Sequence, residues 1–292
     1  MVNRIAAIST AASALLGCVA EKRPDPAPRD QAPQVLRIEA RDFAFTVPEQ
    51  VRAGLVRVRL VNHGREWHEA LVTRLADSVS TDAYLASARA GDAFPAGAFD
   101  VGGPGKVAMG DSSEVVIKLE PGRYAVVCWS DNHVKAGMIA SVVVAVDSTR
   151  QTGEAATGQG GGDSATPGSP AATGELRLED FRIAHDSGVY KPGRNVLHIR
   201  NTGARPHDVT FYRLEPGRTP RDFGVWYATR NGPPPAVPVG GMVTLAAGRE
   251  GWAELDLSPG QYLVACGTPE PGPNGVQLHA QMGMVDVFEI PG

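Results

Sequence analysis

An internal repeat constrains the fold of this 292-residue chain more than any other feature of its sequence. The stretch VRVRLVNHGREWHEALVTRL (56–75) matches NVLHIRNTGARPHDVTFYRL (195–214). Each contains an alternating strand, a turn with an asparagine, a histidine and another strand. Residues 101–128 and 239–266 also match, because both begin Val-Gly-Gly and end in a Pro-Gly turn and a Tyr-led strand that reaches a cysteine. Such self-similarity predicts two copies of one domain.

The composition and the turn pattern predict an all-β fold for both copies. The chain has 34 Gly and 23 Pro, and its Val-rich runs are short and separated by Gly, Pro and Asn turns. This pattern is typical of a β-sandwich or barrel, here of the Greek-key type. Residues 80–91 and 219–231 break the pattern, and each predicts a short helix in a connection.

A low-complexity segment separates the two copies. Residues 151–174 (QTGEAATGQGGGDSATPGSPAATG) contain almost no apolar side chain beyond Ala, which predicts a flexible linker. We therefore expect a domain at 34–147, a linker at 148–174 and a second domain at 175–292. Such a linker is not expected to hold a site that the two domains share.

The N-terminus has the features of an export signal. A short basic region with Arg4 precedes an apolar stretch from Ile5 to Leu16, which is too short to span a bilayer as a helix. The following Gly17-Cys18 completes a match that resembles the lipobox of bacterial lipoproteins. The resemblance implies a signal peptide at 1–17, lipidation of Cys18 and a charged, Pro-rich tether at 18–33. The alternative is an ordinary secretory signal with a chance cysteine.

The resemblance to lipoproteins also implies a location. The chain would be anchored in the cell envelope on the periplasmic side, and Val19 after the cysteine favours the outer membrane where the cell has one. The formal net charge is −4, and no basic block suggests nucleic acid as a partner.

The stretch CWSDNHVKAGM (128–138) carries the chemistry. Cys128, His133 and Met138 have four residues in each gap, and the cysteine ends an apolar strand where a loop begins. His68 begins a strand after a turn and could meet them at the same rim. One thiolate, two imidazoles and a weakly held thioether are the ligand set of a blue-copper electron-transfer site.

With these motifs, both repeats resemble cupredoxins, and the match covers most of each domain. The Cys-x4-His-x4-Met spacing of the first repeat resembles the type 1 copper signature. NTGARPHDV (201–209) resembles the segment that carries the first histidine in plastocyanin-like proteins. The resemblance implies copper ligands in the first domain at His68, Cys128, His133 and Met138. In the second domain it implies His207, Cys266, His279 and Met284.

The second repeat departs from the family pattern. Twelve residues (GTPEPGPNGVQL) separate Cys266 from His279. Closing the longer loop costs only about 1 kcal/mol, whereas a bound metal contributes on the order of 10 kcal/mol. We expect one copper ion in the first domain and leave open whether the second domain binds metal. Met282 is an alternative to Met284.

Some residues also have ordinary structural explanations. Exported thiols usually pair, but a bond between Cys128 and Cys266 would need two inward rims to meet within about 7 Å. Three histidines, His63, His185 and His198, have no partner in the repeat and are taken as solvated or satisfied side chains.

The acidic residues and tyrosines of the repeat leave similar choices. Glu69 and Asp208 follow the first histidines and either hydrogen-bond the ligand loops or make surface salt links. Tyr124 and Tyr262 follow the Pro-Gly turns and are expected as core or corner tyrosines.

Three functions were compared. The leading one is a membrane-anchored copper protein that carries single electrons to or from an unknown redox or copper partner protein. The alternative is a cupredoxin-fold interaction or copper-handling module without redox turnover. A copper enzyme is the third, and the chain is expected not to be one. Its cysteines are flanked by Val127 and Trp129 and by Ala265 and Gly267, with no histidine to pass electrons to a second centre.

Overall fold

The computed structural model describes residues 33–90, 96–146, 168–273 and 275–292. The predicted signal peptide, the tether up to residue 32 with Cys18, and the linker up to residue 167 lie outside the described residues. Within the described part, no helix combines the length and the apolar character needed to cross a membrane.

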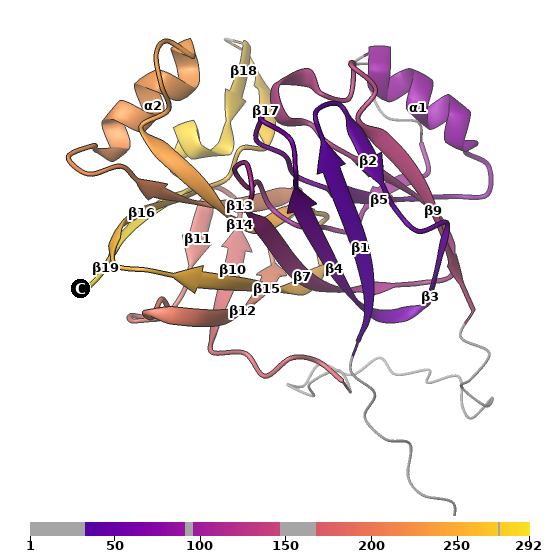
Figure 1. Ribbon diagram of the computed structural model, residues 1–292, viewed down its shortest axis with the longest axis horizontal. Coiled ribbons are helices and arrows are strands. Elements are labelled where there is room, and N and C mark those ends of the chain that lie inside the picture. Colours follow the sequence, from indigo (N-terminus) through magenta and orange to yellow (C-terminus); the bar gives the residue numbers. More distant parts are fainter. Residues whose placement is uncertain (1–32, 91–95, 147–167, 274) are drawn as a thin grey trace, which may run out of the picture. The chain divides into compact units, whose positions relative to one another are not determined.

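The first half of the chain forms strands of two sheets (Figure 1). In one sheet, β1 runs parallel to β4, and β4 pairs antiparallel with β7. Its strands are β1 (Gln34–Arg41), β2 (Ala44–Thr46), β4 (Gly54–Asn62) and β7 (Ser112–Leu119). The other sheet has the order β3-β9-β8-β5-β6. Its strands are β3 (Gln50–Arg52), β5 (Leu71–Leu75), β6 (Ala98–Asp100), β8 (Gly122–Val127) and β9 (Ile139–Ala145).

The second half repeats this arrangement. One set has the order β11-β10-β12-β15 and the other the order β14-β13-β16-β19. The first set contains β10 (Gly174–Glu179), β11 (Arg182–Ala184), β12 (Gly193–Asn201) and β15 (Glu250–Leu257). The second contains β13 (His207–Leu214), β14 (Ala236–Leu245), β16 (Gly260–Ala265) and β19 (Val285–Ile290). A separate hairpin joins β17 (Pro269–Gly272) to β18 (Gly275–Leu278).

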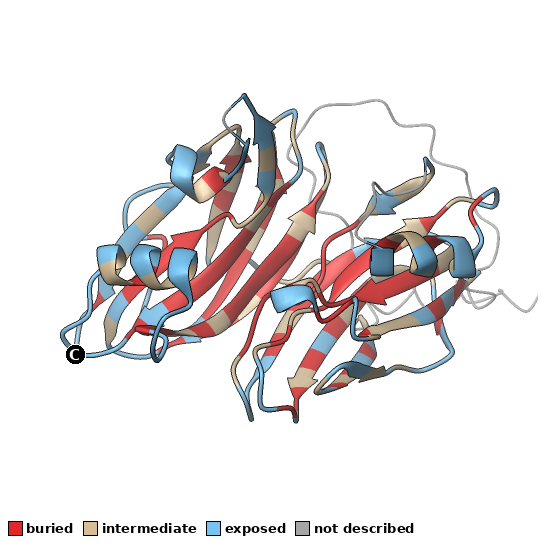
Figure 2. Ribbon diagram, turned by 90° about the horizontal axis from the view of Figure 1, so that it is seen from above, coloured by how far each residue is buried: buried red, intermediate tan, exposed pale blue. Residues whose placement is uncertain are grey.

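The core forms between the sheets because their strands alternate apolar and polar side chains. In β4, for example, Val56, Val58 and Leu60 are fully buried and lie in one cluster with Val72 and Val126 of the facing sheet. Figure 2 shows the buried residues running along the strands of both halves. The prediction of an all-β fold with short helices is confirmed.

The two helices form where the sequence predicts them. They are α1 (Thr81–Ala90) and α2 (Pro220–Thr229). Thr219 caps α2, since its hydroxyl accepts from the Asp222 backbone N–H while the Asp222 carboxylate accepts from Thr219 N–H. Two 3-10 turns, η1 (Ser130–Asn132) and η2 (His279–Met282), lie in the loops that carry the second histidines.

The predicted corner tyrosines are present in both halves. Tyr124 and Tyr262 are buried, and each hydroxyl donates to a carbonyl four residues upstream, at Glu120 and Ser258, over 2.8 Å. This contact ties each Tyr-led strand to the turn before it, and the cysteine follows at the far end of the same strand.

The halves are joined directly, which the flexible linker did not suggest. Strand β7 pairs with β15, so that one eight-stranded sheet crosses both halves. The repeated segments 101–107 and 239–245 also pair with each other, through Val101 with Leu245, Pro104 with Met242, and Val107 with Val239. Pro104 and Met242 are equivalent positions of the repeat, so the pairing is that of a pseudo-twofold axis. The two halves are therefore in direct contact along this joint.

Candidate metal centres

The same turn, present in both halves, positions the first histidine of each half. The Asn62 side chain donates to Glu66 O (2.8 Å) and Val107 O (3.2 Å) and accepts from Gly64 N–H (2.8 Å). In the second half, Asn201 makes the same contacts with Arg205 O, Leu245 O and Gly203 N–H. These bonds hold the turn that delivers His68 and His207 to the rim.

Backbone hydrogen bonds fix the other residues of each set. In the first half, Cys128 N–H donates to Met138 O (3.2 Å), and Met138 N–H donates to His133 O (3.0 Å). The second half repeats this pattern between Cys266, Met284 and His279, with distances of 3.1 and 3.0 Å. Cysteine, histidine and methionine therefore keep fixed relative positions in both halves.

The structure brings three of the four candidate ligands of the first half together, and we call this set centre 1. His68 Nδ1 lies 3.1 Å from His133 Nδ1, and Cys128 Sγ lies 3.8 and 3.5 Å from these two nitrogens. Cys128 and His68 are fully buried, and His133 is 4% exposed.

The second half has the same triangle, which we call centre 2. His207 Nδ1 lies 3.0 Å from His279 Nδ1, and Cys266 Sγ lies 4.0 and 3.5 Å from them. All three side chains are fully buried. These two triads are the groups of His, Cys, Asp or Glu in the described part of the chain that could hold a metal ion.

Both triangles have the size that a metal ion requires. An ion such as zinc binds imidazole nitrogen at about 2.0–2.1 Å and thiolate at about 2.3 Å, which places three trigonal donors about 3.5–3.8 Å apart. The observed spacings of 3.0–4.0 Å bracket this range, with both Nδ1–Nδ1 distances about 0.5 Å shorter than the trigonal value. A His₂Cys set with a soft thiolate selects copper rather than magnesium or calcium, so the residues fit a copper ion in each half.

The methionines lie where the pattern predicts them. Met138 and Met284 are fully buried, whereas Met282 is 38% exposed, which favours Met284 over the alternative. Their role as axial ligands stays a prediction.

The long loop of the second half does not weaken its site. Eight of its residues form the paired strands β17 and β18, in which Pro269 pairs with Leu278. His279 N–H donates to Thr268 O (3.0 Å) across the base of this hairpin. Because the ends of the extra segment meet, Cys266 and His279 lie as close as Cys128 and His133. The expectation that centre 2 is the poorer site is not supported by the geometry.

A carboxylate orients the first histidine of each centre, a contact that the sequence interpretation missed. His68 Nε2 faces Asp42 Oδ1 at 3.4 Å, and His207 Nε2 faces Asp180 Oδ1 at 3.1 Å. Asp42 Oδ1 also accepts from Arg65 N–H over 2.7 Å. A metal-ligating histidine usually has such a partner, which fixes its tautomer.

A phenylalanine packs against the second histidine of each centre. The rings of Phe43 and His133 meet edge to face at 5.3 Å, and those of Phe181 and His279 meet at 5.1 Å. Both phenylalanines have left-handed backbone angles, φ 64° and 63°, which are rare for a bulky residue. The repeated Asp-Phe pairs in the sequence were the signal for these four residues.

The acidic residues after the first histidines differ in role. Asp208 Oδ1 accepts from the Cys266 thiol (3.2 Å) and from the Thr268 hydroxyl (2.8 Å). Glu69 instead forms an ion pair with the buried Lys106, at 3.9 Å. Asp208 therefore hydrogen-bonds the ligand loop, which was one of the two predicted alternatives. Glu69 forms the salt link of the other alternative, but this salt link is buried.

Burial sets the protonation of the donors. It raises the pKa of the Cys128 thiol to about 12, and it also raises the pKa of Cys266. Burial, reinforced by the neighbouring His133, lowers the pKa of His68, and burial lowers that of His133 and His207 as well. Without metal, these three histidines are therefore neutral and both thiols are protonated at pH 7.

The remaining cysteine and histidine predictions hold. Cys128 and Cys266 are free thiols. His63 pairs with Glu39, His185 with Asp286 (2.8 Å), and His198 with Glu250 (3.2 Å). These three histidines are thus satisfied by carboxylates away from the two centres, and His198 also lies 3.9 Å from Glu175.

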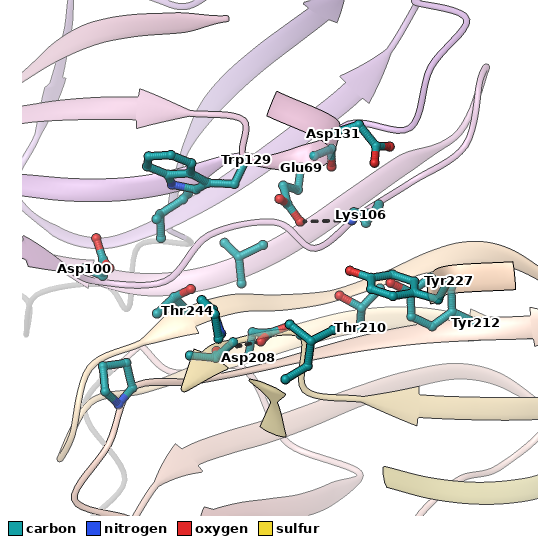
Figure 3. Close-up of a pocket in the computed structure, with 18 of the residues that line it drawn as sticks. Glu69, Asp100, Lys106, Trp129, Asp131, Asp208, Thr210, Tyr212, Tyr227 and Thr244 are labelled. Atoms are coloured by element: carbon teal, nitrogen blue, oxygen red, sulfur yellow. Dashed lines mark hydrogen bonds and ion pairs between the residues drawn. The ribbon is translucent and has the colours of Figure 1, made fainter. Parts of the chain in front are cut away.

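A cavity of about 630 Å³ lies between the halves (Figure 3). Glu69 and Trp129, which follow ligands of centre 1, line it together with Asp208 and Gly267, which follow ligands of centre 2. Lys106 lies in its wall. Both centres thus border one cavity, which has the volume of a small-molecule site.

Comparison with known proteins gives structural likeness only. No protein-family model matches the chain, and no curated protein matches its sequence. Among solved structures, auracyanin A from Chloroflexus aurantiacus, a "blue" copper protein, is 17% identical with a TM-score of 0.29 and covers 39% of this chain and 99% of its own. A copper nitrite reductase from Nitrosomonas europaea is 14% identical with a TM-score of 0.25 and covers 90% and 95%.

A third structure also matches along most of the chain. The blue copper oxidase from Nitrosomonas europaea is 14% identical with a TM-score of 0.25, and the match covers 88% of this chain and 86% of that one. The structures that match along most of the chain are thus those of enzymes, and the prediction that the chain is not an enzyme was wrong. A likeness this distant concerns the fold and gives this chain no reaction. The two-sheet topology, repeated with its Cys, His and Met positions, shows that the chain consists of two cupredoxin folds in tandem.

Proposed function

We propose that the chain is a copper-binding electron-transfer protein with one type 1-like centre in each half. The observation that carries the proposal is the pair of buried Nδ1, Nδ1 and Sγ triangles, each of the size that one ion requires. When bound, copper supplies a one-electron couple between Cu(I) and Cu(II).

The chain's own residues serve this chemistry by staying in place. The histidines are held by carboxylates and by phenylalanine edges, and the cysteines are held at strand ends by backbone bonds to the methionines. A rigid donor set changes little when an electron arrives or leaves, which favours fast transfer. Complete burial of both sulfur atoms excludes water from the donors.

The proposal includes a place and a partner. Lipidation of Cys18 would anchor the chain to the cell envelope on the periplasmic side, where an unidentified redox protein or copper protein exchanges electrons with it. A Cys18→Ser variant should move from the membrane fraction to the soluble fraction of cells. If the variant stays in the membrane fraction, the anchor is not at this cysteine.

Copper loading tests the central claim. The full-length protein should bind two copper ions per chain and show intense visible thiolate-to-copper absorption. Cys128→Ser and Cys266→Ser should each abolish binding of one copper ion and the absorption that this ion causes. A protein that stays colourless and retains no copper would refute the proposal. Binding of Cu(I) alone, without redox cycling, would support a copper-handling module instead.

The cavity favours a second function, that of an oxidoreductase acting on a small molecule. A donor or acceptor seated there would contact residues directly bonded to Cys128 and Cys266. Gly267 has room for a side chain, since an added Cβ would come no closer than 3.8 Å to Asp208 and Tyr227. Gly267→Leu should therefore slow the reduction of the copper centres by small molecules that bind in the cavity. Gly224→Leu, which adds a side chain in open space on α2, should leave this rate unchanged. Equal rates in both variants would argue against the cavity as a site.

A further inference from the structure

The two centres have the same ligands but different charges around them. The first difference is a buried cation beside centre 1. Val107 pairs with His68 through bonds of 2.9 and 3.2 Å, so Lys106 lies next to that pairing, and its side chain is only 10% exposed. In the second half, the equivalent of Val107 is Leu245, which pairs with His207, and the equivalent of Lys106 is the neutral Thr244.

Lys106 keeps its charge in this position. Burial by itself lowers the pKa of the ammonium, but the Glu69 carboxylate, two tyrosines and Cys128 outweigh it, so the pKa lies above its usual value. Centre 1 therefore has a permanent cation close by. The acidic residue of its own half, Glu69, is turned toward that cation.

The second difference is a carboxylate at the sulfur of centre 2. Asp208 Oδ1 lies 3.2 Å from Cys266 Sγ, and the hydrogen bond that it accepts from the Thr268 hydroxyl is neutral. No cation of the described residues forms an ion pair with Asp208. The Asp208 carboxylate thus has no counterion next to Cys266, whereas its equivalent in centre 1, Glu69, has Lys106 as its counterion.

The third difference is a carboxylate behind the second histidine. Glu270, on the hairpin found only in the second half, lies 3.3 Å from His279 Nε2. Glu270 also forms an ion pair with Arg205 Nε at 3.2 Å, so it acts on centre 2 through its hydrogen bond to His279 rather than as an uncompensated charge. Among the described residues, no carboxylate forms a hydrogen bond or an ion pair with His133, and Asp131, Glu66 and Glu69 act on it only from a greater distance. A carboxylate behind a ligating histidine raises the basicity of the ligand.

The first two differences together amount to one net charge, and the third acts in the same direction. An oxidised centre carries one more positive charge than a reduced one, so nearby anions and more basic ligands stabilise the oxidised form, and a nearby cation destabilises it. Building on the proposed function, we infer that centre 1 has the higher reduction potential, so that an electron delivered to centre 2 moves on to centre 1. In this step centre 2 loses one electron and centre 1 gains it, with no bond made or broken.

The arrangement of the centres suits such a relay. Residues bonded to ligands of both centres line the same cavity, and the segments 101–107 and 239–245 pair between them. The halves thus form one electron path with a built-in direction rather than two independent carriers.

A redox titration of the full-length, copper-loaded protein tests the inference. The visible band should disappear in two one-electron steps, and Cys128→Ser and Cys266→Ser assign each step to a centre. The first of the two electrons taken up by each chain should reduce centre 1 and remove its visible absorption. Lys106→Thr should lower the potential of centre 1, and the converse variant Thr244→Lys should raise that of centre 2. Glu270→Gln, on the surface hairpin, should also raise the potential of centre 2 and narrow the gap.

The outcomes separate the inference from the proposed function. A protein that binds no copper defeats both. Two bound ions that titrate in a single step, or with centre 2 reduced first, overturn the inference and leave copper binding intact. If Lys106→Thr fails to fold, Glu270→Gln still tests the inference. An unchanged difference between the two reduction potentials in that variant contradicts the inference.

Discussion

A methyl group added at Gly103 should damage centre 1 from a distance. Gly103 has φ +152°, and a Cβ built there would lie 2.0 Å from the carbonyl oxygen of Ala70, two residues after His68. Side-chain contacts of this kind essentially never fall below 3.0 Å. In Gly103→Ala, the strand that carries His68 must therefore move by about 1 Å, a displacement large enough to misplace a ligand.

The cost in stability has two parts. An alanine in this backbone region costs about 1–3 kcal/mol, and the overpacking costs about another 1–3 kcal/mol. We expect the free energy of unfolding to fall by about 2–6 kcal/mol in urea titrations. The visible band of centre 1 should weaken while that of centre 2 remains.

The chain supplies matched controls for this change. Gly241 is the repeat equivalent of Gly103, and its Cβ would lie 2.1 Å from Val209 O, two residues after His207. Gly241→Ala should therefore affect centre 2 instead. Gly110 has φ +83° but open space around it, so Gly110→Ala should cost only about 1–2 kcal/mol and spare both bands. If Gly103→Ala behaves like Gly110→Ala, the close approach to Ala70 is not what holds His68.

Three further outcomes are expected. Because burial raises the pKa of Cys128 to about 12, copper must displace a proton from the thiol. Affinity should therefore fall as the pH falls, by about tenfold per pH unit between pH 9 and 7 in competition titrations, and a flat profile would contradict thiolate ligation. Asp42→Asn should weaken copper binding at centre 1 by about 10–100-fold without unfolding the protein, as measured by the same titration. Arg57 pairs with Glu114 and Glu254, which lie opposite each other across the β7–β15 joint. Arg57→Met should cost about 1–3 kcal/mol in urea unfolding, since it leaves two like charges face to face.

The sequence predicted the fold and the candidate ligands because both depend on local pattern. Strand alternation placed Cys128 on the inward face at the end of its strand, and the repeat identified the same position at Cys266. The two helices could be predicted because Thr219 and the following proline form a start signal that acts within one turn.

The features that the sequence did not predict depend on pairing between distant segments. The loop after Cys266 contains three prolines and shows no alternation, so nothing in it indicated that Pro269 and Leu278 pair and close it. Asp42 lies 26 residues before His68, and its contact follows from the register of β1 with β4. The Gly-rich segment 101–107 has no strand pattern, yet it pairs across the halves because its backbone is unobstructed.

The pseudo-twofold pairing explains why differences between the halves carry functional weight. Around such an axis, equivalent residues of the two halves lie symmetrically about the joint, and so Glu69 and Asp208 line the same cavity. Two identical halves would place two equal centres there, and an electron would have no preferred direction between them. In the second half, Thr244 stands in place of Lys106, and a hairpin with Glu270 stands in place of a short loop. These differences leave the ligand residues unchanged and alter the charge around them. The asymmetry thus includes the surrounding charge, the property that sets the direction of transfer, and exchanging Lys106 and Thr244 should bring the two potentials closer together.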